Sequence, residues 1–368
     1  KDNKHRLIYG KHCMKIIADE NLAFTDYFFA EFAEIQHQAG RALTHANVQD
    51  ADALLVRSVT KVNHDLIDQT QIKFVGSATI GTDHLDIPAL EQQNIAWSNA
   101  AGCNAQAVAE YVITALLHLN MDLLEKNKAF TLAIVGLGNV GKRLAVMAQL
   151  LGWNVIGYDP YVQLAGIENV SFQELLKQAD AISIHVPLTT SGDYPTLHLF
   201  DEAALAEMKS SAILINSARG PVIQQSALMA DIEKTKRQVV LDVFEFEPEI
   251  PQELLERLAL ATPHIAGYSL EGKARGTQMI YEAFCHTFGY QPSKNFESQL
   301  PTVEQYFGQQ DLKASLKQHL VQIYNIAEDD QQLRACVQAA KVEQKAFDLL
   351  RKNYPLRREW AAHGGPKA

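Results

Sequence analysis

Short apolar runs alternate with polar or helical stretches through the first three quarters of the chain. The runs KIIAD, ADALLV, IKFVG and IAWSN are each short enough to be a buried strand, and each is followed by polar residues. A helix is expected after the first run, from about Phe24 to Phe32. Because strands that alternate with helices form parallel βαβ units, the pattern predicts an α/β protein with doubly wound parallel sheets.

A second series of apolar runs follows a long helix. The stretch NAQAVAEYVITALLHLNMDLL is apolar over much of a helical circumference, which is typical of a buried linking helix. After it come TLAIV, NVIGY, AISIHV, AILIN, QVVLDV and LALAT, which predict a second parallel sheet. We therefore expect two Rossmann-like domains, the first at residues 14–112 with 267–289 and the second at residues 113–266.

The pattern changes after Gly289. The stretch YQPSKNFESQLPTV is polar and contains prolines, as a domain boundary does, and LKASLKQHLVQIYNI and VEQKAFDLLRKNY are amphipathic. These features predict a small C-terminal α+β domain at residues 290–368. A piece of this size is marginally stable alone, so we expect it to pack on a partner and to make the protein a homodimer.

Composition narrows the class of protein. The chain has 368 residues, 47% hydrophobic and 21% charged, which is ordinary for a soluble globular protein of two or three domains. Its net charge of −10 argues against a broad nucleic-acid surface, and no apolar run approaches the roughly 18 residues of a membrane span. Residues 1–13 lack the apolar core of a signal peptide and are treated as an N-terminal extension.

The cysteines point to a reducing compartment. Cys13, Cys103, Cys285 and Cys336 are scattered and lack the spacing of metal ligands. We therefore expect free thiols, no metal site and a cytoplasmic location.

The motif GLGNVG is the clearest chemical signal. It places Gly136, Gly138 and Gly141 in G-x-G-x-x-G register after an apolar strand, where they open a helix. The first glycine permits a tight turn, the second lets the backbone approach a pyrophosphate, and the third allows close packing of helix on strand. The backbone at the start of the helix, at Asn139 and Val140, is expected to meet the phosphates.

An acidic residue completes the fingerprint. Asp159 ends the next strand, 18 residues after Gly141, where its carboxylate can accept hydrogen bonds from both hydroxyls of an adenosine ribose. It would repel a 2′-phosphate, which favours NAD over NADP. The alternative is a glycine-rich turn that binds nothing, but the complete strand–turn–helix–strand–acid context favours a dinucleotide.

Three further residues lie near predicted strand ends. They are Arg219 in INSARGPV, Glu247 in LDVFEFEP and His264 in TPHIAGY, 17 residues after Glu247. A guanidinium suits a carboxylate ligand, and a carboxylate paired with imidazole can take a proton from a hydroxyl as hydride leaves the same carbon. Each residue alone has an ordinary structural interpretation. Together with the dinucleotide motif they predict an active site.

These motifs resemble the D-isomer-specific 2-hydroxyacid dehydrogenase superfamily. The matching residues read GLGNVG…D, NSARG, DVFEFEP and HIAG. The resemblance implies that Arg219 anchors the substrate carboxylate, Glu247 orients the histidine, and His264 is the general acid/base.

Further motifs resemble the narrower family of erythronate-4-phosphate dehydrogenases. They are ADENLAFT, VRSVTKVN, FVGSATIGTDHLD, GCNAQAVAEYV, TPHIAGYSLEGKARGT and LRKNYPLRRE. The resemblance implies NAD-dependent oxidation of 4-phospho-D-erythronate at C2, in pyridoxal 5′-phosphate biosynthesis, and a C-terminal dimerisation domain. The implied substrate contacts are Ser58, Thr79 and Tyr268. The implied cofactor contacts are Asp159, Ser217, Ala218, Arg219, Asp242 and Gly267.

Several cations suit a phosphorylated substrate. Arg57, Ser58 and Lys61 share one loop after a strand, and we expect Arg57 or Lys61 to help hold the phosphate. The segment GKARG adds two more cations. The cations of PLRR, residues 355–358, fit a solvated surface as well as an anion site.

One position departs from the superfamily pattern. Val186 in HVPL stands where the superfamily often has a hydroxyl, and the neighbouring His185 is interpreted as structural.

Two other functions are compatible with part of the pattern. One is another D-2-hydroxyacid dehydrogenase, such as one acting on 3-phosphoglycerate, although the C-terminal segment lacks the strand alternation of a regulatory βαββαβ module. The other is a non-catalytic NAD-sensing scaffold. The presence of Arg219, Glu247 and His264 argues against a protein without activity.

Overall fold

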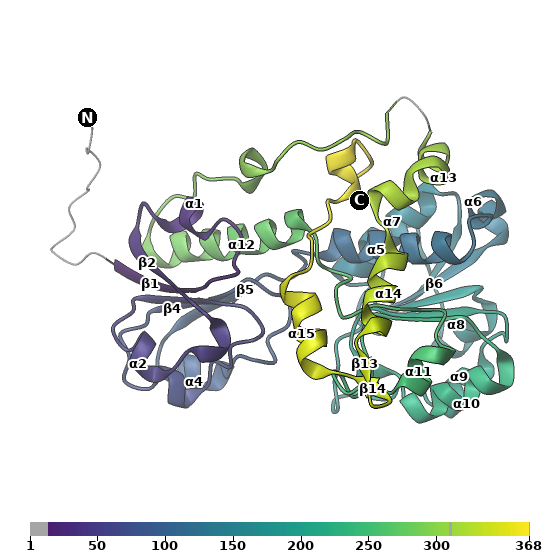
Figure 1. The fold of residues 1–368 in the computed structure, drawn as a ribbon, viewed down its shortest axis with the longest axis horizontal. Coiled ribbons are helices and arrows are strands. Elements are labelled where there is room, and N and C mark those ends of the chain that lie inside the picture. The colour runs from purple at the N-terminus through teal and green to yellow at the C-terminus, as the bar shows by residue number, and fades with distance from the viewer. Residues whose placement is uncertain (1–13, 309–310, 368) are drawn as a thin grey trace. The chain divides into compact units, whose positions relative to one another are not determined.

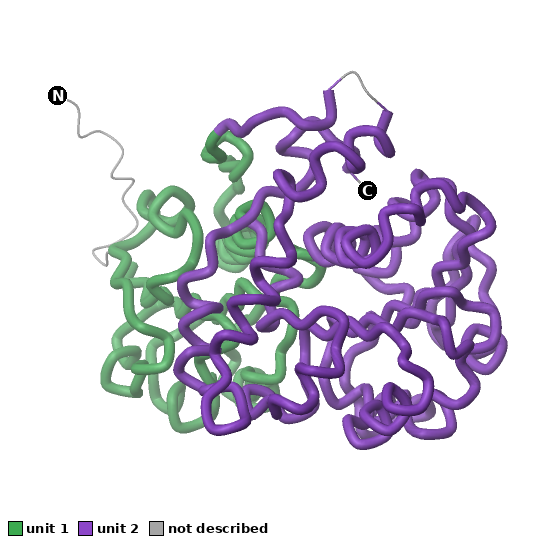
Figure 2. Tube along the Cα trace, turned by 45° about the vertical axis from the view of Figure 1, so that its right-hand side comes forward, with its two compact units in different colours: residues 1–104, 270–301 green, residues 105–269, 302–368 purple. Residues whose placement is uncertain are grey.

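The computed structural model describes residues 14–308 and 311–367. The chain divides into two compact units, residues 1–104 with 270–301 and residues 105–269 with 302–368 (Figure 2). The predicted N-terminal extension, with Cys13, lies outside the described residues. The domain boundaries predicted above stay predictions.

Unit 1 is built on a five-stranded parallel sheet (Figure 1) in the order β2-β1-β3-β4-β5. Its strands are β1 (Met14–Asp19), β2 (Ala33–Gln38), β3 (Ala53–Val56), β4 (Phe74–Ser77) and β5 (Ala96–Asn99). Its α-helices are α1 (Thr25–Phe29), α2 (His45–Val48), α3 (His64–Ile67), α4 (Ile87–Gln92) and α12 (Leu270–Phe288).

Alternate side chains of these strands enter two hydrophobic cores. Ile16 and Leu55 point to the face covered by α1 and α12, whereas Ile17, Leu54 and Val56 point to the face covered by α2, α3 and α4. All five side chains are fully buried. Because both faces are covered, the strands read as continuous apolar runs rather than as alternating ones.

Unit 2 is built on a seven-stranded parallel sheet in the order β12-β11-β10-β9-β6-β7-β8. Its strands are β6 (Thr131–Val135), β7 (Asn154–Tyr158), β8 (Glu168–Asn169), β9 (Ala181–Ile184), β10 (Ile213–Asn216), β11 (Val239–Leu241) and β12 (Leu260–Ala261). The helices before β12 are α5 (Ala105–Leu119), α6 (Leu123–Lys126), α7 (Asn139–Leu150), α8 (Phe172–Gln178), α9 (Glu202–Glu207), α10 (Gln225–Thr235) and α11 (Gln252–Arg257).

Helices cover both faces of this sheet as well. One core packs α5 and α7 on the sheet, and the other packs α8 to α11 on the opposite face. The predicted linking helix is α5, whose residues Ala105 to Leu117 are all buried. Among the described residues no single helix is long and apolar enough to cross a membrane; α5 passes such a test only jointly with the segment Leu123–Ala129, from which it is bent by 100°.

The end of the chain packs on unit 2. It contains α13 (Leu312–Ile323), α14 (Ile326–Ala335), the hairpin of β13 (Val337–Gln338) and β14 (Lys341–Val342), and α15 (Gln344–Lys352). Leu316 and Trp360 join the α5–α7 core, whereas Leu333 and Phe347 join the core beneath α8 to α11. The predicted fold class is confirmed: two doubly wound parallel sheets and a small, mainly helical C-terminal region.

In both sheets the direction of chain winding reverses once. The reversal lies between β1 and β3 in unit 1 and between β6 and β9 in unit 2. In open parallel sheets, ligands bind outside the carboxyl ends of the strands at such a switch point. We therefore expect ligand-binding residues directly after these strands.

Candidate active site

The glycine-rich turn connects β6 to α7. Gly136 has φ +96°, and a Cβ there would lie 2.7 Å from the His185 carbonyl, so the turn requires glycine. A Cβ at Gly141 would overlap the carbonyl oxygen of Gly136, whereas one at Gly138 would meet nothing within 4 Å. The geometry thus agrees with the three expected roles: a tight turn, open space beside the backbone, and close helix–strand packing.

Asp159 is tied to this turn. Its carboxylate accepts a hydrogen bond from the Leu137 N–H at 2.8 Å, and from the N–H groups of Tyr161 and Val162 at 2.9 and 3.0 Å. Asn139 and Val140 form the first turn of α7. The backbone N–H groups at this end lack partners within the helix, which suits an anionic ligand.

The loop after β10 carries Arg219. Asn216 organises it: its side chain accepts a hydrogen bond from the Ala218 N–H at 3.0 Å and donates to the Arg219 carbonyl at 2.9 Å. The Arg219 guanidinium donates to the Ala218 carbonyl at 2.8 Å. The buried hydroxyl of Ser217 has no hydrogen-bond partner in the described part of the chain, so a bound ligand could supply one.

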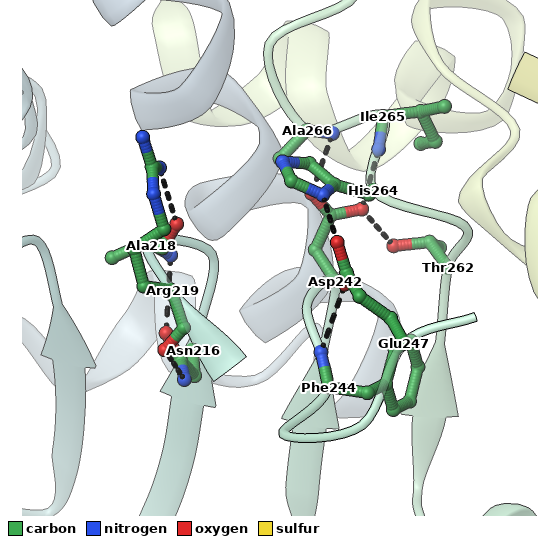
Figure 3. Close-up of polar contacts among 10 residues, drawn as sticks. All are labelled: Asn216, Ala218, Arg219, Asp242, Phe244, Glu247, Thr262, His264, Ile265 and Ala266. Carbon is green, nitrogen blue, oxygen red and sulfur yellow. Dashed lines mark hydrogen bonds and ion pairs between the residues drawn. The ribbon is translucent and has the colours of Figure 1, made fainter. Parts of the chain in front are cut away.

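Glu247 and His264 are brought together. The His264 Nδ1 lies 2.7 Å from the Glu247 Oε1, and the other Glu247 oxygen accepts from the Phe244 N–H at 3.1 Å (Figure 3). Burial raises the pKa of Glu247, but the charge and hydrogen bond of His264 and the Phe244 N–H outweigh it, so this pKa is lowered. An ionised carboxylate only accepts, so Nδ1 carries a proton and Nε2 is the ring nitrogen left for other partners.

Asp242 holds the backbone that follows His264. Its carboxylate accepts from the Thr262 hydroxyl at 2.6 Å, the Ile265 N–H at 2.8 Å and the Ala266 N–H at 2.9 Å (Figure 3). Burial raises the pKa of Asp242, although the charge of His264 and these hydrogen bonds oppose the rise. His264 itself has φ 58°, a left-handed conformation that histidine adopts uncommonly. The loop is therefore held by specific contacts.

Figure 3 shows Arg219 and His264 at one edge of the sheet, with the imidazole turned toward Glu247. They follow β10 and β12, which run parallel within the same sheet. The predicted residues Gly267 and Tyr268 continue the His264 loop, and the Tyr268 N–H donates to the Ile265 carbonyl at 2.8 Å. Unit 2 thus contains all three predicted catalytic residues.

Three predicted substrate contacts lie in unit 1. Arg57 and Ser58 directly follow β3, and Thr79 follows the adjacent strand β4, so they lie at one edge of this sheet. The Arg57 Nε donates to Asp19 at 2.9 Å, and the Thr79 hydroxyl lies 2.9 Å from that of Ser77. Asp19 ends β1, so the Arg57–Asp19 pair marks the switch point of unit 1.

The sequence left two interpretations for the cations of PLRR, a solvated surface and an anion site, and neither holds for Arg357. Its guanidinium donates to the main-chain carbonyls of Ala107, Ile265 and Tyr268, at 3.1 to 3.2 Å, and to that of Ala266. Arg357 is thus neither a solvated surface cation nor an anion ligand in this conformation. The sequence offered no sign of this role, nor of the anchoring of Thr262 by Asp242, because both depend on distant segments.

His185 occupies the loop after β9. Its Nε2 lies 2.8 Å from the Ser183 hydroxyl, and burial lowers its pKa to about 3. A histidine that stays neutral and bonded within its own strand end agrees with the structural interpretation. The neighbouring Val186 packs at the edge of the core beneath α8 to α11.

Comparison with known proteins identifies the family. Residues 118–266 match the family described as D-isomer specific 2-hydroxyacid dehydrogenase, NAD binding domain. An erythronate-4-phosphate dehydrogenase of Acinetobacter baumannii is 73% identical over 355 residues, covering 96% of this chain and 100% of the relative. This chain belongs to the erythronate-4-phosphate dehydrogenase family. The same-named protein of Psychrobacter cryohalolentis is 44% identical over 95% of this chain and 97% of its own.

Membership of the erythronate-4-phosphate dehydrogenase family confirms the predicted class, an NAD-dependent dehydrogenase with an NAD-binding domain. The fold agrees with a solved D-lactate dehydrogenase of Aquifex aeolicus, at a TM-score of 0.61 and 22% identity over 75% of this chain and 96% of that one. Residues 299–363 match a family described only as a domain of unknown function.

Proposed function

We propose that this chain oxidises 4-phospho-D-erythronate at C2 to (R)-3-hydroxy-2-oxo-4-phosphooxybutanoate. The C2 hydrogen leaves with its electron pair as hydride, and the hydroxyl proton leaves separately, so the alcohol becomes a ketone. When bound, NAD accepts the hydride and becomes NADH. The relatives' name and the paired side chains of unit 2 support this reaction.

The observation that carries the proposal is the 2.7 Å contact between His264 and Glu247. With Nδ1–H donated to the carboxylate, Nε2 has the lone pair that can take the C2 hydroxyl proton. The imidazolium formed in this step is stabilised by the adjacent Glu247 charge. Glu247 therefore orients His264 and supports its charged form, while His264 moves the proton.

Arg219 has the chemistry to anchor the substrate carboxylate. A guanidinium binds a carboxylate through two parallel hydrogen bonds, which fixes the orientation of the neighbouring C2 carbon. Asn216 holds the loop from which Arg219 projects. We assign Arg219 to substrate orientation on this basis.

The cofactor contacts follow the glycine-rich turn and the strand ends. Gly136, Gly138, Asn139, Val140 and Gly141 are proposed to hold the pyrophosphate and Asp159 the adenosine ribose, as the open space beside Gly138 allows. The loop residues proposed to complete the cofactor site are Ser217, Ala218, Asp242 and Gly267. The unpartnered Ser217 hydroxyl supports this assignment.

The remaining substrate contacts are proposed to be Arg57, Ser58, Thr79 and Tyr268. Arg57 is the candidate for the phosphate because Asp19 bonds only its Nε, and its side chain is 22% exposed. Ser58 and Thr79 offer hydroxyls beside it at the same sheet edge. A dianion favours such a group of cation and hydroxyls.

We further propose a cytoplasmic homodimer that contributes to pyridoxal 5′-phosphate biosynthesis. Among the described residues, Cys103, Cys285 and Cys336 form no disulfide, which suits a reducing compartment. Residues 290–368 are proposed to form the dimer contact. Sedimentation at micromolar protein tests this assembly, and a monomer there would contradict it.

An NADH-production assay tests the reaction. The purified protein is given NAD with 4-phospho-D-erythronate, 3-phosphoglycerate or D-lactate, and kcat/KM is compared. We expect 4-phospho-D-erythronate to exceed the other two by at least about a hundredfold, because the others lack its length or its phosphate. Preference for 3-phosphoglycerate would assign the chain to a different 2-hydroxyacid dehydrogenase activity, and NADH binding without turnover would indicate a sensor.

A further inference from the structure

The C-terminal segment reaches the loop that carries His264. The Arg357 guanidinium donates to the carbonyls of Ile265 and Tyr268 at 3.1 and 3.2 Å, and to that of Ala266. A fourth donor hydrogen bond, at 3.1 Å, goes to the carbonyl of Ala107 in α5. One side chain therefore joins the His264 loop to the long buried helix of the same unit.

The backbone N–H groups of the same loop are bound by Asp242. It accepts from the N–H groups of Ile265 and Ala266, the residues whose carbonyls Arg357 binds. The peptide groups that follow His264 are thus held by an anion at their donors and by a cation at their acceptors. This two-sided arrangement explains how His264 keeps its left-handed φ of 58°.

Arg357 is itself held in place by neighbours in unit 2. Its guanidinium carbon lies 4.4 Å from the centre of the Tyr324 ring, a stacking that arginine favours. Adjacent residues of the same segment are anchored too: Glu359 accepts from the Ser269 hydroxyl at 2.9 Å, and the Trp360 N–H donates to Glu110 at 3.0 Å. The position of the guanidinium is therefore well defined.

We propose that Arg357 is a positioning residue for the dehydrogenase reaction, acting by fixing the His264 loop so that the imidazole meets both Glu247 and the substrate hydroxyl. The inference rests on the proposed role of His264. The hydrogen bonds of Arg357 to this loop go to main-chain carbonyls, so Arg357 acts by holding the loop and does not itself touch the substrate. The C-terminal segment then supports the active site of the same chain.

The same region provides a matched control. Arg334 of α14 also donates to main-chain carbonyls, those of Leu255 and Leu258, and it pairs with Asp330 at 2.8 Å. Its contacts hold the end of α11 and do not involve the His264 loop. Removing either arginine leaves main-chain carbonyls without their donor, but only the loss of Arg357 removes support from the His264 loop.

Steady-state kinetics of Arg357→Ala, Arg357→Lys and Arg334→Ala with 4-phospho-D-erythronate test the inference. For Arg357→Ala we expect kcat to fall about a hundredfold, as displacement of a catalytic group by about 1 Å does. The changes in KM and NADH affinity should be much smaller, although Tyr268 and Gly267 lie on the same loop. Millimolar guanidinium should restore part of kcat in this variant only. Arg357→Lys should show a smaller loss, since an ammonium cannot bridge the same carbonyls, and Arg334→Ala should retain kcat. An equal kcat for the Arg357 and Arg334 variants would overturn the proposal.

A second readout is independent of turnover. Ring ¹⁵N chemical shifts report the tautomer of His264 and its bond to Glu247. We expect these shifts to change in Arg357→Lys and to stay as in the wild type in Arg334→Ala. If the wild type does not turn over 4-phospho-D-erythronate, the proposed function fails while this measurement still decides whether Arg357 positions His264. Unchanged shifts in Arg357→Lys would reject the positioning role.

Discussion

Two buried aspartates that lie at or just after strand ends bind different kinds of hydrogen-bond donor in the two units. Asp242 follows β11 of unit 2, and both of its oxygens accept hydrogen bonds from neutral groups of the His264 loop. Asp19 ends β1 of unit 1, and its Oδ1 accepts from Asn21 N–H and from Arg57. Its Oδ2 has no partner in the described part of the chain. One aspartate organises a loop, whereas the other holds a cation.

This difference in hydrogen-bond donors distinguishes the carboxyl edges of the two sheets. Asp242 is 1% exposed and accepts hydrogen bonds from three neutral donors around His264. We propose that these contacts preorganise this edge of the sheet for proton transfer. Arg57 remains 22% exposed, so its guanidinium keeps access to solvent and to an anionic ligand. We therefore propose that the unit 2 edge positions the catalytic histidine and that the unit 1 edge binds the substrate phosphate.

The largest difference is expected when each aspartate is removed. Asp242→Ala leaves the Thr262 hydroxyl and two N–H groups without their acceptor, so we expect a loss of about 3 kcal/mol in the free energy of unfolding, with loss of turnover. Asp19→Ala leaves Arg57 able to reach water, so we expect a smaller loss in the free energy of unfolding, about 1 kcal/mol. Urea unfolding of both variants measures this. Equal losses would remove the distinction between the two edges.

The next effect concerns substrate binding at unit 1. Arg57→Ala should raise the KM for 4-phospho-D-erythronate about tenfold, because a charge-assisted hydrogen bond of about 1.5 kcal/mol is lost. The kcat and the affinity for NADH should stay close to the wild-type values. Lys61→Ala is the matched variant on the same loop. A rise in KM for Lys61→Ala alone would transfer the phosphate contact from Arg57 to Lys61.

The smallest effect is a pH dependence at unit 2. The pKa of Glu247 is lowered from its ordinary value of 4.5, so its ionised form is favoured by folding. The stability it contributes is complete above that value and is lost as pH falls through the lowered pKa. Glu247→Gln should therefore be less stable than the wild type at about pH 6, by about 1 kcal/mol, and the gap should narrow toward about pH 3. A gap that widens on acidification would contradict the assignment.

The sequence predicted the residues that follow strands better than it predicted the supporting contacts. The buried runs of β3, β4 and β6 are largely apolar, so the pattern located the strand ends that precede Arg57, Thr79 and Gly136. Thr79 itself was named as a substrate contact only by the family resemblance. Edge strand β2 was not predicted because its sequence AEIQHQ is largely polar and only its first residue is buried. Neither was β8, which is two residues long.

Long-range contacts explain the other omissions. Helix α12 begins with two glycines in its first turns, which disfavours helix in a sequence-based prediction, yet Gly276 is required because a Cβ there would lie 2.8 Å from the Ala78 carbonyl oxygen. Arg357 lies 92 residues from Ile265, so its role depends on packing of the C-terminal segment. Such contacts follow from the tertiary structure and leave no local pattern.

Kinetics of His264→Ala test the central claim, that His264 paired with Glu247 moves the C2 hydroxyl proton. We predict that kcat for 4-phospho-D-erythronate falls about a thousandfold, the usual contribution of a general base, while NADH affinity measured by fluorescence titration stays within about twofold of the wild type. Turnover at the wild-type rate with intact NADH binding would contradict the account.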